Sequence, residues 1–423
     1  MSKRNSIKDL DNRSLRILMP SYRSHPYTGG QGIYMRLVTK AMIGLGHSVE
    51  VLSGQPYPIL DEGVGLTKLP SLDLYSYEKP LDSFNFNLFK DWINLYEWFS
   101  HLTGGFSEPY TFGERMARWG KNNYSNYDVV HDNQTLAWGL LKLKNMGLPV
   151  VGTIHHPITM DKRIDIQHAK SISLKILKWR WYSFLNMQIK VARKLDPIIV
   201  VSENTRKDLV KDFKIDPKKT RKVLHGIDHE TFKPIKNIAR EKNSLITTAS
   251  ADVPLKGLIY LIRAYDMLLK EFPDLKLTVI GRLREGPTSE ELEKRGIKEK
   301  VKFVTDLSGE EITELYARST IAVSPSVYEG FGFPAGEAMS CGIPLVATNG
   351  GSLPEVVGDA GIIVQHSNPG SLVNALQDLL NSPEKQKELS YKGRKRVLER
   401  FTWKRAAKEL VEIYKEAIIN VNS

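Results

Sequence analysis

Two glutamates eight positions apart enclose the segment best suited to chemistry, Glu329-Gly330-Phe331-Gly332-Phe333-Pro334-Ala335-Gly336-Glu337. Proline is favoured in the first helical turn, so Pro334 predicts that a helix begins there. Gly330 and Gly332 would leave backbone N–H groups open beside that helix start, where an anion is stabilised. Backbone amides can donate hydrogen bonds to an anion, and carboxylates can accept them from hydroxyls. Together they suit a ligand in which a diphosphate is joined to a polyhydroxyl group. The alternative is that the two acids only stabilise the positive end of the helix.

A second glycine cluster, Gly29-Gly30-Gln31-Gly32, follows an apolar run and precedes a helical pattern. It is either a loop that lets an anion approach the backbone or a tight turn that needs positive φ. Met35 stands where the G-x-G-x-x-G fingerprint requires its last glycine, which argues against a nicotinamide cofactor.

His155 and His156 end another apolar run, but no third residue follows at a spacing typical of a metal site. Adjacent residues of a strand also face opposite sides of its sheet. The single cysteine, Cys341, excludes an internal disulfide and a cysteine-rich metal centre. We therefore expect no metal.

Short apolar runs alternate with longer helical patterns along nearly the whole chain. The predicted strands are residues 15–20, 48–53, 128–131, 149–154, 197–202, 244–250, 275–281, 301–306, 320–326 and 343–348. Such runs separated by helices predict parallel strands covered on both faces, in two doubly wound α/β domains. Ligands of these sheets bind beyond the carboxyl ends of the strands, which is where the motifs above occur. The boundary between the domains is expected within residues 225–237.

Composition and charge narrow the class of protein further. The chain has 423 residues and a net charge of +12, and residues 1–226 hold that whole excess, with 33 Lys and Arg against 21 Asp and Glu. An excess confined to one half favours an anionic partner, although a solvated basic face is the alternative. No apolar run reaches the ~18 residues of a membrane span, and the N-terminus lacks the apolar core of a signal peptide. We expect a cytoplasmic protein, peripheral at the inner face of the membrane if it binds one.

The segment EGFGFPAGEAMSCGIPLVATNGGSLPEVVGDAGIIV, from Glu329, resembles the signature of the family 4 retaining glycosyltransferases, with its E-x7-E motif. Further matches are Thr153-Ile154-His155, residues 225–228, Lys256-Gly257 and residues 401–403, so the resemblance runs roughly from Arg16 to Tyr414. It implies the GT-B fold, in which two Rossmann-like domains face each other across a cleft. Residues 1–230, joined by a terminal helix at about 406–423, would be the acceptor side, and residues 231–405 the donor domain.

The resemblance also implies roles for individual residues. The residues with implied catalytic roles are His155, Glu329 and Lys256. The implied donor-binding residues are Gly29, Gly30, Gly32, Lys256, Phe331, Gly332, Phe333 and Glu337. In this assignment Glu337 binds the ribose, Lys256 the diphosphate, and Glu329 and His155 lie near the transferred sugar. The nucleotide-diphosphate sugar is a substrate, and no other cofactor is implied.

One departure from the family concerns the diphosphate. The family commonly has an arginine five or six positions before the lysine, where this chain has Ala251 and Ser250. Arg282, at the end of a predicted strand, is a candidate replacement, and a surface arginine is the alternative.

Residues 171–195 combine basic and aromatic side chains and predict one amphipathic helix. Its packing face would hold Leu174, Leu177, Trp181, Leu185 and Ala192, and its exposed face Lys175, Trp179, Tyr182, Asn186, Lys190 and Arg193. A tryptophan among lysines suits an anionic membrane surface. The alternative is a helix that simply covers the sheet. No RNP-type motif is present, so nucleic acid is not an expected partner.

These observations predict a metal-independent, retaining glycosyltransferase, most simply a hexosyltransferase, whose acceptor is a membrane lipid, another anionic molecule or a small soluble one. Two rivals stay open. One is a nucleotide-sugar epimerase or phosphorylase on the same fold, and the other is a nonenzymatic nucleotide-binding protein at a membrane surface.

Overall fold

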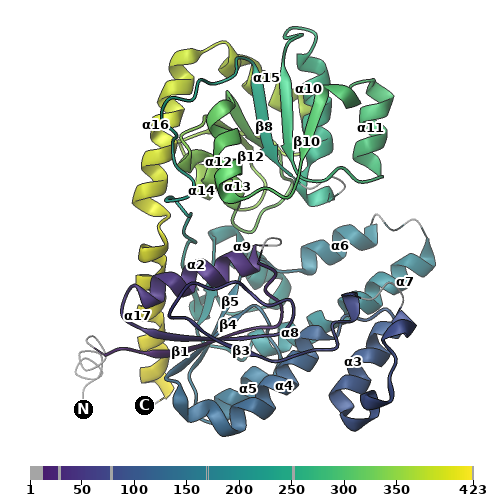
Figure 1. Ribbon diagram of the computed structural model, residues 1–423, viewed down its shortest axis with the longest axis vertical. Coiled ribbons are helices and arrows are strands. Elements are labelled where there is room, and N and C mark those ends of the chain that lie inside the picture. The colour runs from purple at the N-terminus through teal and green to yellow at the C-terminus, as the bar shows by residue number, and fades with distance from the viewer. Residues whose placement is uncertain are drawn as a thin grey trace. The chain divides into compact units, whose positions relative to one another are not determined.

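The computed structural model describes residues 13–26, 30–76, 80–167, 169, 171–249 and 253–421. The chain forms two compact units (Figure 1). Unit 1 consists of Met1–Val201, Thr205–Val223 and Ala406–Ser423, and unit 2 of Ser202–Asn204 and Leu224–Arg405. Each unit is built on a parallel sheet with helices on both faces, so the expected pair of Rossmann-like α/β domains is confirmed.

The sheet of unit 1 has the strand order β3-β2-β1-β4-β5-β6-β7. The strands are β1 (Arg16–Ser21), β2 (Ser48–Ser53), β3 (Gly65–Lys68), β4 (Val129–Asn133), β5 (Val150–Ile154), β6 (Ile198–Val200) and β7 (Thr220–Lys222). The helices are α2 (Gln31–Ile43), α3 (Trp92–Leu102), α4 (Glu108–Asn123), α5 (Trp138–Asn145), α6 (Thr159–Gln167), α7 (Ile172–Trp181), α8 (Leu185–Ala192) and, from Thr205 onward, α9 (Glu203–Asp208). Figure 1 shows α4, α5 and α8 along one face of this sheet and α2 along the other.

The sheet of unit 2 has the order β10-β9-β8-β11-β12-β13. Its strands are β8 (Ser244–Thr248), β9 (Lys276–Ile280), β10 (Val301–Val304), β11 (Ile321–Ser324), β12 (Leu345–Thr348) and β13 (Ile362–Val364). Its helices are α10 (Leu258–Leu268), α11 (Pro287–Arg295), α12 (Gly309–Arg318), α13 (Phe333–Ser340), α14 (Leu353–Val357), α15 (Pro369–Leu380) and α16 (Pro383–Arg400). In Figure 1, α10 and α15 cover one face, and α12, α13 and α14 the other.

The central strands form where the sequence has continuous apolar runs, because both faces of each strand are buried. Every residue of β4, β5, β11 and β12 is buried. The edge strands β3, β7 and β13 were not predicted. β3 and β7 contain few buried residues and several polar ones, so they lack the apolar signal that marks the central strands.

The single helix expected over residues 171–195 is wrong. The chain forms α7, a 3-10 turn at Tyr182–Phe184 and then α8. At this break Phe106 contacts the rings of both Trp181 and Phe184, with centroids 5.1 and 5.3 Å away. Leu174 and Leu177, expected on the packing face, are 44% and 47% exposed, whereas Tyr182, expected in solvent, is 8% exposed.

The last helix, α17 (Trp403–Val421), begins in unit 2, and its residues from Ala406 onward belong to unit 1. There the Tyr414 hydroxyl lies 2.5 Å from Nδ1 of His131, whose Nε2 contacts the Thr153 hydroxyl at 2.6 Å. Burial lowers the pKa of His131 to about 3, so this ring is neutral inside the core. Across the ranges that the structure describes, no helix is both long and apolar enough to span a membrane.

Candidate functional site

In unit 2, Lys256 is placed by the loop between β8 and α10. The 3-10 turn Pro254–Lys256 ends at Gly257, which has φ of 63° and begins α10. A Cβ at Gly257 would overlap the carbonyl oxygen of Pro325, in the loop that follows β11. Strands β8 and β11 are parallel neighbours. Glycine at 257 therefore lets two loops meet at the carboxyl edge of the sheet.

Lys256 and Glu329, which lie in separate sequence motifs, form an ion pair in this structure. Lys256 Nζ lies 2.7 Å from Oε1 of Glu329, and the same oxygen accepts a hydrogen bond from the Ser326 hydroxyl at 2.8 Å. The two charged side chains are 32% and 12% exposed. The cation is thus held beside the carboxylate and remains accessible to a ligand.

The backbone around Glu329 is fixed by the turn after β12. Ser352 donates from its N–H to the carbonyl oxygen of Glu329 at 3.0 Å and from its hydroxyl to that of Phe331 at 2.7 Å. Gly351 has φ of 62°, and a Cβ there would overlap the Glu329 carbonyl. Loops from three adjacent strands, β8, β11 and β12, therefore form one rigid edge.

The start of α13 offers unused hydrogen-bond donors. Gly332, with φ of 94°, is the N-cap, and Pro334 lies in the first turn. Within the described chain, the N–H groups of Phe331, Gly332 and Phe333 donate no hydrogen bond. Open N–H groups at the positive end of a helix attract an anion. This edge can therefore bind a phosphate.

The side chains of Phe331 and Phe333 serve the fold. Phe331 is buried, and its ring lies 5.1 Å from that of His225, which stacks on Phe333 at 5.4 Å. His225 also stacks on Trp403 at 5.9 Å. Residues near 225, 331 and 403, separate in the sequence, thus meet beneath the loop and support its backbone.

Glu337 lies in the middle of α13. Burial raises the pKa of its carboxyl to about 7, and the charge of Asp228 adds to this effect. In the described part of the chain the carboxyl makes no hydrogen bond. It can accept hydrogen bonds from ligand hydroxyls, and a ligand that does so would favour the ionised form.

In unit 1, His155 directly follows β5. Its Nε2 lies 2.7 Å from Oδ1 of Asn133, and its backbone N–H donates to Oε1 of Gln134 at 2.6 Å. Asn133 donates from its amide nitrogen to the Ser21 hydroxyl at 3.3 Å, so its oxygen faces the histidine and Nε2 carries the proton. Burial lowers the pKa of His155 to about 3. The imidazole is neutral, and Tyr34 packs edge-on against it at 4.8 Å.

The glycine loop of unit 1 leads into α2. Gly30 has φ of 74° and is the N-cap, and a Cβ at Gly32 would overlap the carbonyl oxygen of His25. Both glycines are thus required by the backbone whether or not the loop binds an anion. Gly29 lies outside the described residues.

Arg282, the candidate replacement for the arginine that the family commonly has before the lysine, lies on the surface. Ser250 and Ala251 both lie outside the described residues. Arg282 pairs with Asp306 at 3.3 Å, and both side chains are largely exposed, as expected of a surface arginine. Among the residues that the structure describes, no group of three His, Cys, Asp or Glu side chains could hold a metal ion.

Several residues that position the site were missed. Ser326 and Ser352 support Glu329, and Asn133 and Gln134 support His155. The polar run His131-Asp132-Asn133-Gln134, which directly follows the apolar pair Val129-Val130, was an available signal for the second pair. The serines had no comparable signal, because their role depends on loops that meet only in the fold.

Comparisons with known families cover both halves of the chain. The model described as Glycosyl transferases group 1 matches residues 229–396, and the one described as Glycosyltransferase Family 4 matches residues 28–231. MMP alpha-(1->4)-mannosyltransferase of Mycolicibacterium hassiacum is 41% identical over 412 residues, which cover 96% of this chain and 99% of that one. A D-inositol 3-phosphate glycosyltransferase of Saccharomonospora viridis is 28% identical, over 69% of this chain and 70% of its own.

Solved structures confirm the expected GT-B fold. Sucrose-phosphate synthase from Thermosynechococcus elongatus matches with a TM-score of 0.71 and 20% identity, over 96% of this chain and 99% of that one. Anabaena HepE in complex with UDP matches with a TM-score of 0.65 and 16% identity, over 94% of this chain and 99% of that one.

We expect Glu337 to make stability depend on pH. Its pKa in the folded state is about 7, above the ordinary value of 4.5. Between these two pH values the folded state therefore keeps a proton that the unfolded state loses. The contribution of Glu337 to the stability of the folded state is therefore fully present below pH ~4.5 and is lost as pH rises through ~7. Glu337→Gln should raise the free energy of unfolding at pH 8 by on the order of 1–3 kcal/mol, and far less at pH 5. Urea denaturation at both pH values measures this.

Glu285→Gln, at an exposed glutamate of the same unit, is the matched control. If both variants shift stability equally at the two pH values, Glu337 is not a buried, protonated carboxyl.

Proposed function

The chain belongs to glycosyltransferase family 4, and on that basis we propose that it transfers a hexosyl group from a nucleoside diphosphate sugar to a saccharide hydroxyl, with retention at the anomeric carbon. Mannose is our assignment for the sugar, because a relative named as an alpha-(1->4)-mannosyltransferase is 41% identical over nearly the whole chain. The same name supports a saccharide acceptor. Retention rests on the family resemblance.

The observation that carries this proposal is the Lys256–Glu329 ion pair beside the open amides of Phe331, Gly332 and Phe333. In the proposal, Lys256 turns from Glu329 to the incoming diphosphate, and the amides bind the same phosphates. Glu329 is then released to accept hydrogen bonds from the sugar. Glu337 binds the ribose hydroxyls.

In the proposed reaction, the bond from the anomeric carbon to the diphosphate oxygen breaks. The acceptor oxygen bonds to that carbon on the face of the sugar from which the diphosphate departs. The acceptor's proton passes to the departing phosphate oxygen, so no protein base is required. Negative charge grows on the leaving group, and Lys256 with the amides stabilises it without a metal. We assign His155 to the transferred sugar from the family resemblance; its neutral imidazole, held by Asn133, can exchange hydrogen bonds with a hydroxyl.

The proposal predicts acceptor-dependent release of nucleoside diphosphate. Purified protein is incubated with GDP-mannose, UDP-mannose or UDP-glucose, with and without an α-(1→4)-linked mannobiose, and with excess chelator. Release should require the mannobiose and survive the chelator, and NMR of the product should show an α linkage.

Each rival has its own signature in this assay. Epimerisation without acceptor would indicate an epimerase, and dependence on inorganic phosphate a phosphorylase. The absence of any donor turnover would favour a nonenzymatic nucleotide-binding protein. A rate that collapses with chelator and returns with magnesium would overturn metal independence alone.

A specific surface supports a second proposal, that unit 1 binds anionic membranes. Helix α7 contains no buried residue, and Ile172, Ile176 and Trp179 are 78%, 65% and 61% exposed. Lys175 lies exposed on the same helix, and Lys162 Nζ lies 4.0 Å from the centre of the Trp179 ring. Apolar and basic side chains mixed in this way suit a membrane interface. Arg193, expected to contribute, donates instead to the carbonyl oxygen of Phe213 at 2.6 Å.

Binding to vesicles containing phosphatidylserine should rise with the anionic fraction and fall with salt, since each basic residue contributes ~1 kcal/mol near such a surface. Lys175→Glu combined with Trp179→Ser should weaken cosedimentation strongly. Lys387→Glu with Tyr391→Ser, a pair of the same spacing on the exposed side of α16, is the control. If the wild type ignores these vesicles at low salt, the basic charge is only a solvated face.

A further inference from the structure

Unit 1 contains a cavity of about 290 Å³ between helices α3, α4, α5 and α8. Its lining includes Tyr96, Tyr110, Trp138, Phe184, Asn186 and Lys190. None of these residues belongs to the site described above. We call this cavity the aromatic groove.

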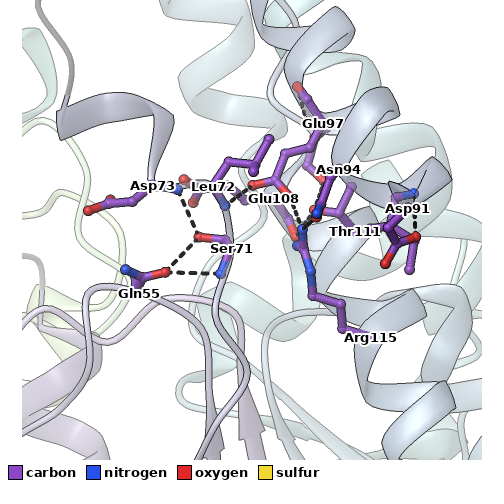
Figure 2. A network of polar contacts seen from close by, with 12 residues as sticks. Gln55, Ser71, Leu72, Asp73, Asp91, Asn94, Glu97, Glu108, Thr111 and Arg115 are labelled. Atoms are coloured by element: carbon purple, nitrogen blue, oxygen red, sulfur yellow. Dashed lines mark hydrogen bonds and ion pairs between the residues drawn. The ribbon is translucent and has the colours of Figure 1, made fainter. Parts of the chain in front are cut away.

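One wall of the aromatic groove is held in place by a buried ion pair. Arg115, on α4, lies 2.5 Å from Oε2 of Glu97 on α3, and also donates to Oδ1 of Asn94 at 2.8 Å (Figure 2). The Glu97 and Arg115 side chains are only 2% and 11% exposed. Oε1 of Glu97 accepts the N–H of Leu72 at 3.2 Å. The network fixes α3 against α4.

That attachment places two tyrosines beside each other. The rings of Tyr96 and Tyr110 have centroids 5.0 Å apart and are inclined at 55°. Tyr96 is 42% exposed, so a ligand can reach its ring. Half-exposed aromatic rings in a preformed cavity are typical of small-molecule sites.

The groove also offers hydrogen bonds that the protein does not use. Within the described residues, the side chains of Tyr96, Tyr110, Asn186 and Lys190 make no hydrogen bond. Arg180, the other cation of the lining, is engaged by the hydroxyls of Ser100 and Ser183, each at 3.1 Å. The lining contains no carboxylate. One available cation suits a ligand that is neutral overall and rich in hydroxyls, and does not suit a polyanion.

We propose that the aromatic groove binds sugar units of the acceptor that do not react, with the tyrosine and tryptophan rings covering the apolar faces of the sugars. This deepens, and rests on, the proposed transfer to a saccharide.

The topology of unit 1 places the groove at the functional end of its sheet. Helices that connect parallel strands run back across the sheet, so their N-termini lie near the carboxyl ends of the strands. Trp138 is the first residue of α5, shortly after Asn133, the partner of His155. Tyr110 lies in the first turn of α4. A chain occupying the groove therefore extends along the edge that carries His155.

Anchoring part of a chain raises the effective concentration of its reactive end. We expect the KM for an α-(1→4)-linked mannotetraose to be lower than that for methyl α-mannoside by at least about tenfold. Tyr96→Ala should raise the KM for the tetraose about tenfold, leave its kcat unchanged and leave the kinetics of the methyl mannoside unaltered. Tyr124→Ala, at a tyrosine of unit 1 that is 38% exposed and outside the groove, should change neither.

Calorimetry with the mannotetraose alone gives a second readout, in which Tyr96→Ala and Lys190→Ala should both weaken binding. If transfer occurs but KM is independent of chain length and of Tyr96, the groove is not an acceptor site. If Tyr96→Ala abolishes vesicle binding and leaves the KM for the tetraose unchanged, the groove binds lipid. If no saccharide accepts a sugar, the proposed function fails, and binding of the tetraose by calorimetry still tests the groove separately.

Discussion

The candidate site in unit 2 depends on one ion pair, between Lys256 and Glu329. It connects two loops that follow neighbouring strands, and the turn at Ser352 secures the carbonyl oxygen of the same glutamate. A lysine and a carboxylate held together stabilise the two loops, because neither charge is left alone in a partly dry environment. In the proposed function, a diphosphate takes the place of Glu329 as the partner of the lysine.

In unit 1 the corresponding constraint is a neutral imidazole, that of His155. His155 is held by Asn133 and Gln134, and His131 is buried in contact with Tyr414 of the last helix. Burial keeps both rings uncharged, which suits contact with hydroxyls better than contact with phosphate. Lys256 and the open amides at the start of α13 thus lie in unit 2, whereas the neutral histidines and the aromatic groove lie in unit 1. This division is the one that the proposed charged donor and saccharide acceptor would require.

The sequence was informative where a signal is local. Continuous apolar runs predicted the central strands, and the two glutamates with their glycines predicted the loop at the start of α13. The edge strands β3 and β7 were not predicted, because so few of their residues are buried. The break at Tyr182–Phe184 was not predicted, because the chain packs there against Phe106, which is distant in the sequence. Ser352, and the meeting of Tyr96 with Tyr110, also depend on contacts between remote segments, which periodicity does not reveal.

The affinity of Lys256→Ala for a nucleoside diphosphate, compared with its affinity for the parent nucleoside, tests the central claim most directly. A charge-assisted hydrogen bond contributes ~1.5–3 kcal/mol, so calorimetry should show a Kd for the diphosphate raised by roughly 10- to 100-fold and an unchanged Kd for the nucleoside. Lys270→Ala, at an exposed lysine of the same unit, should alter neither value. Equal losses for both ligands, or no loss for either, would show that Lys256 supports the fold or its glutamate and does not bind the diphosphate.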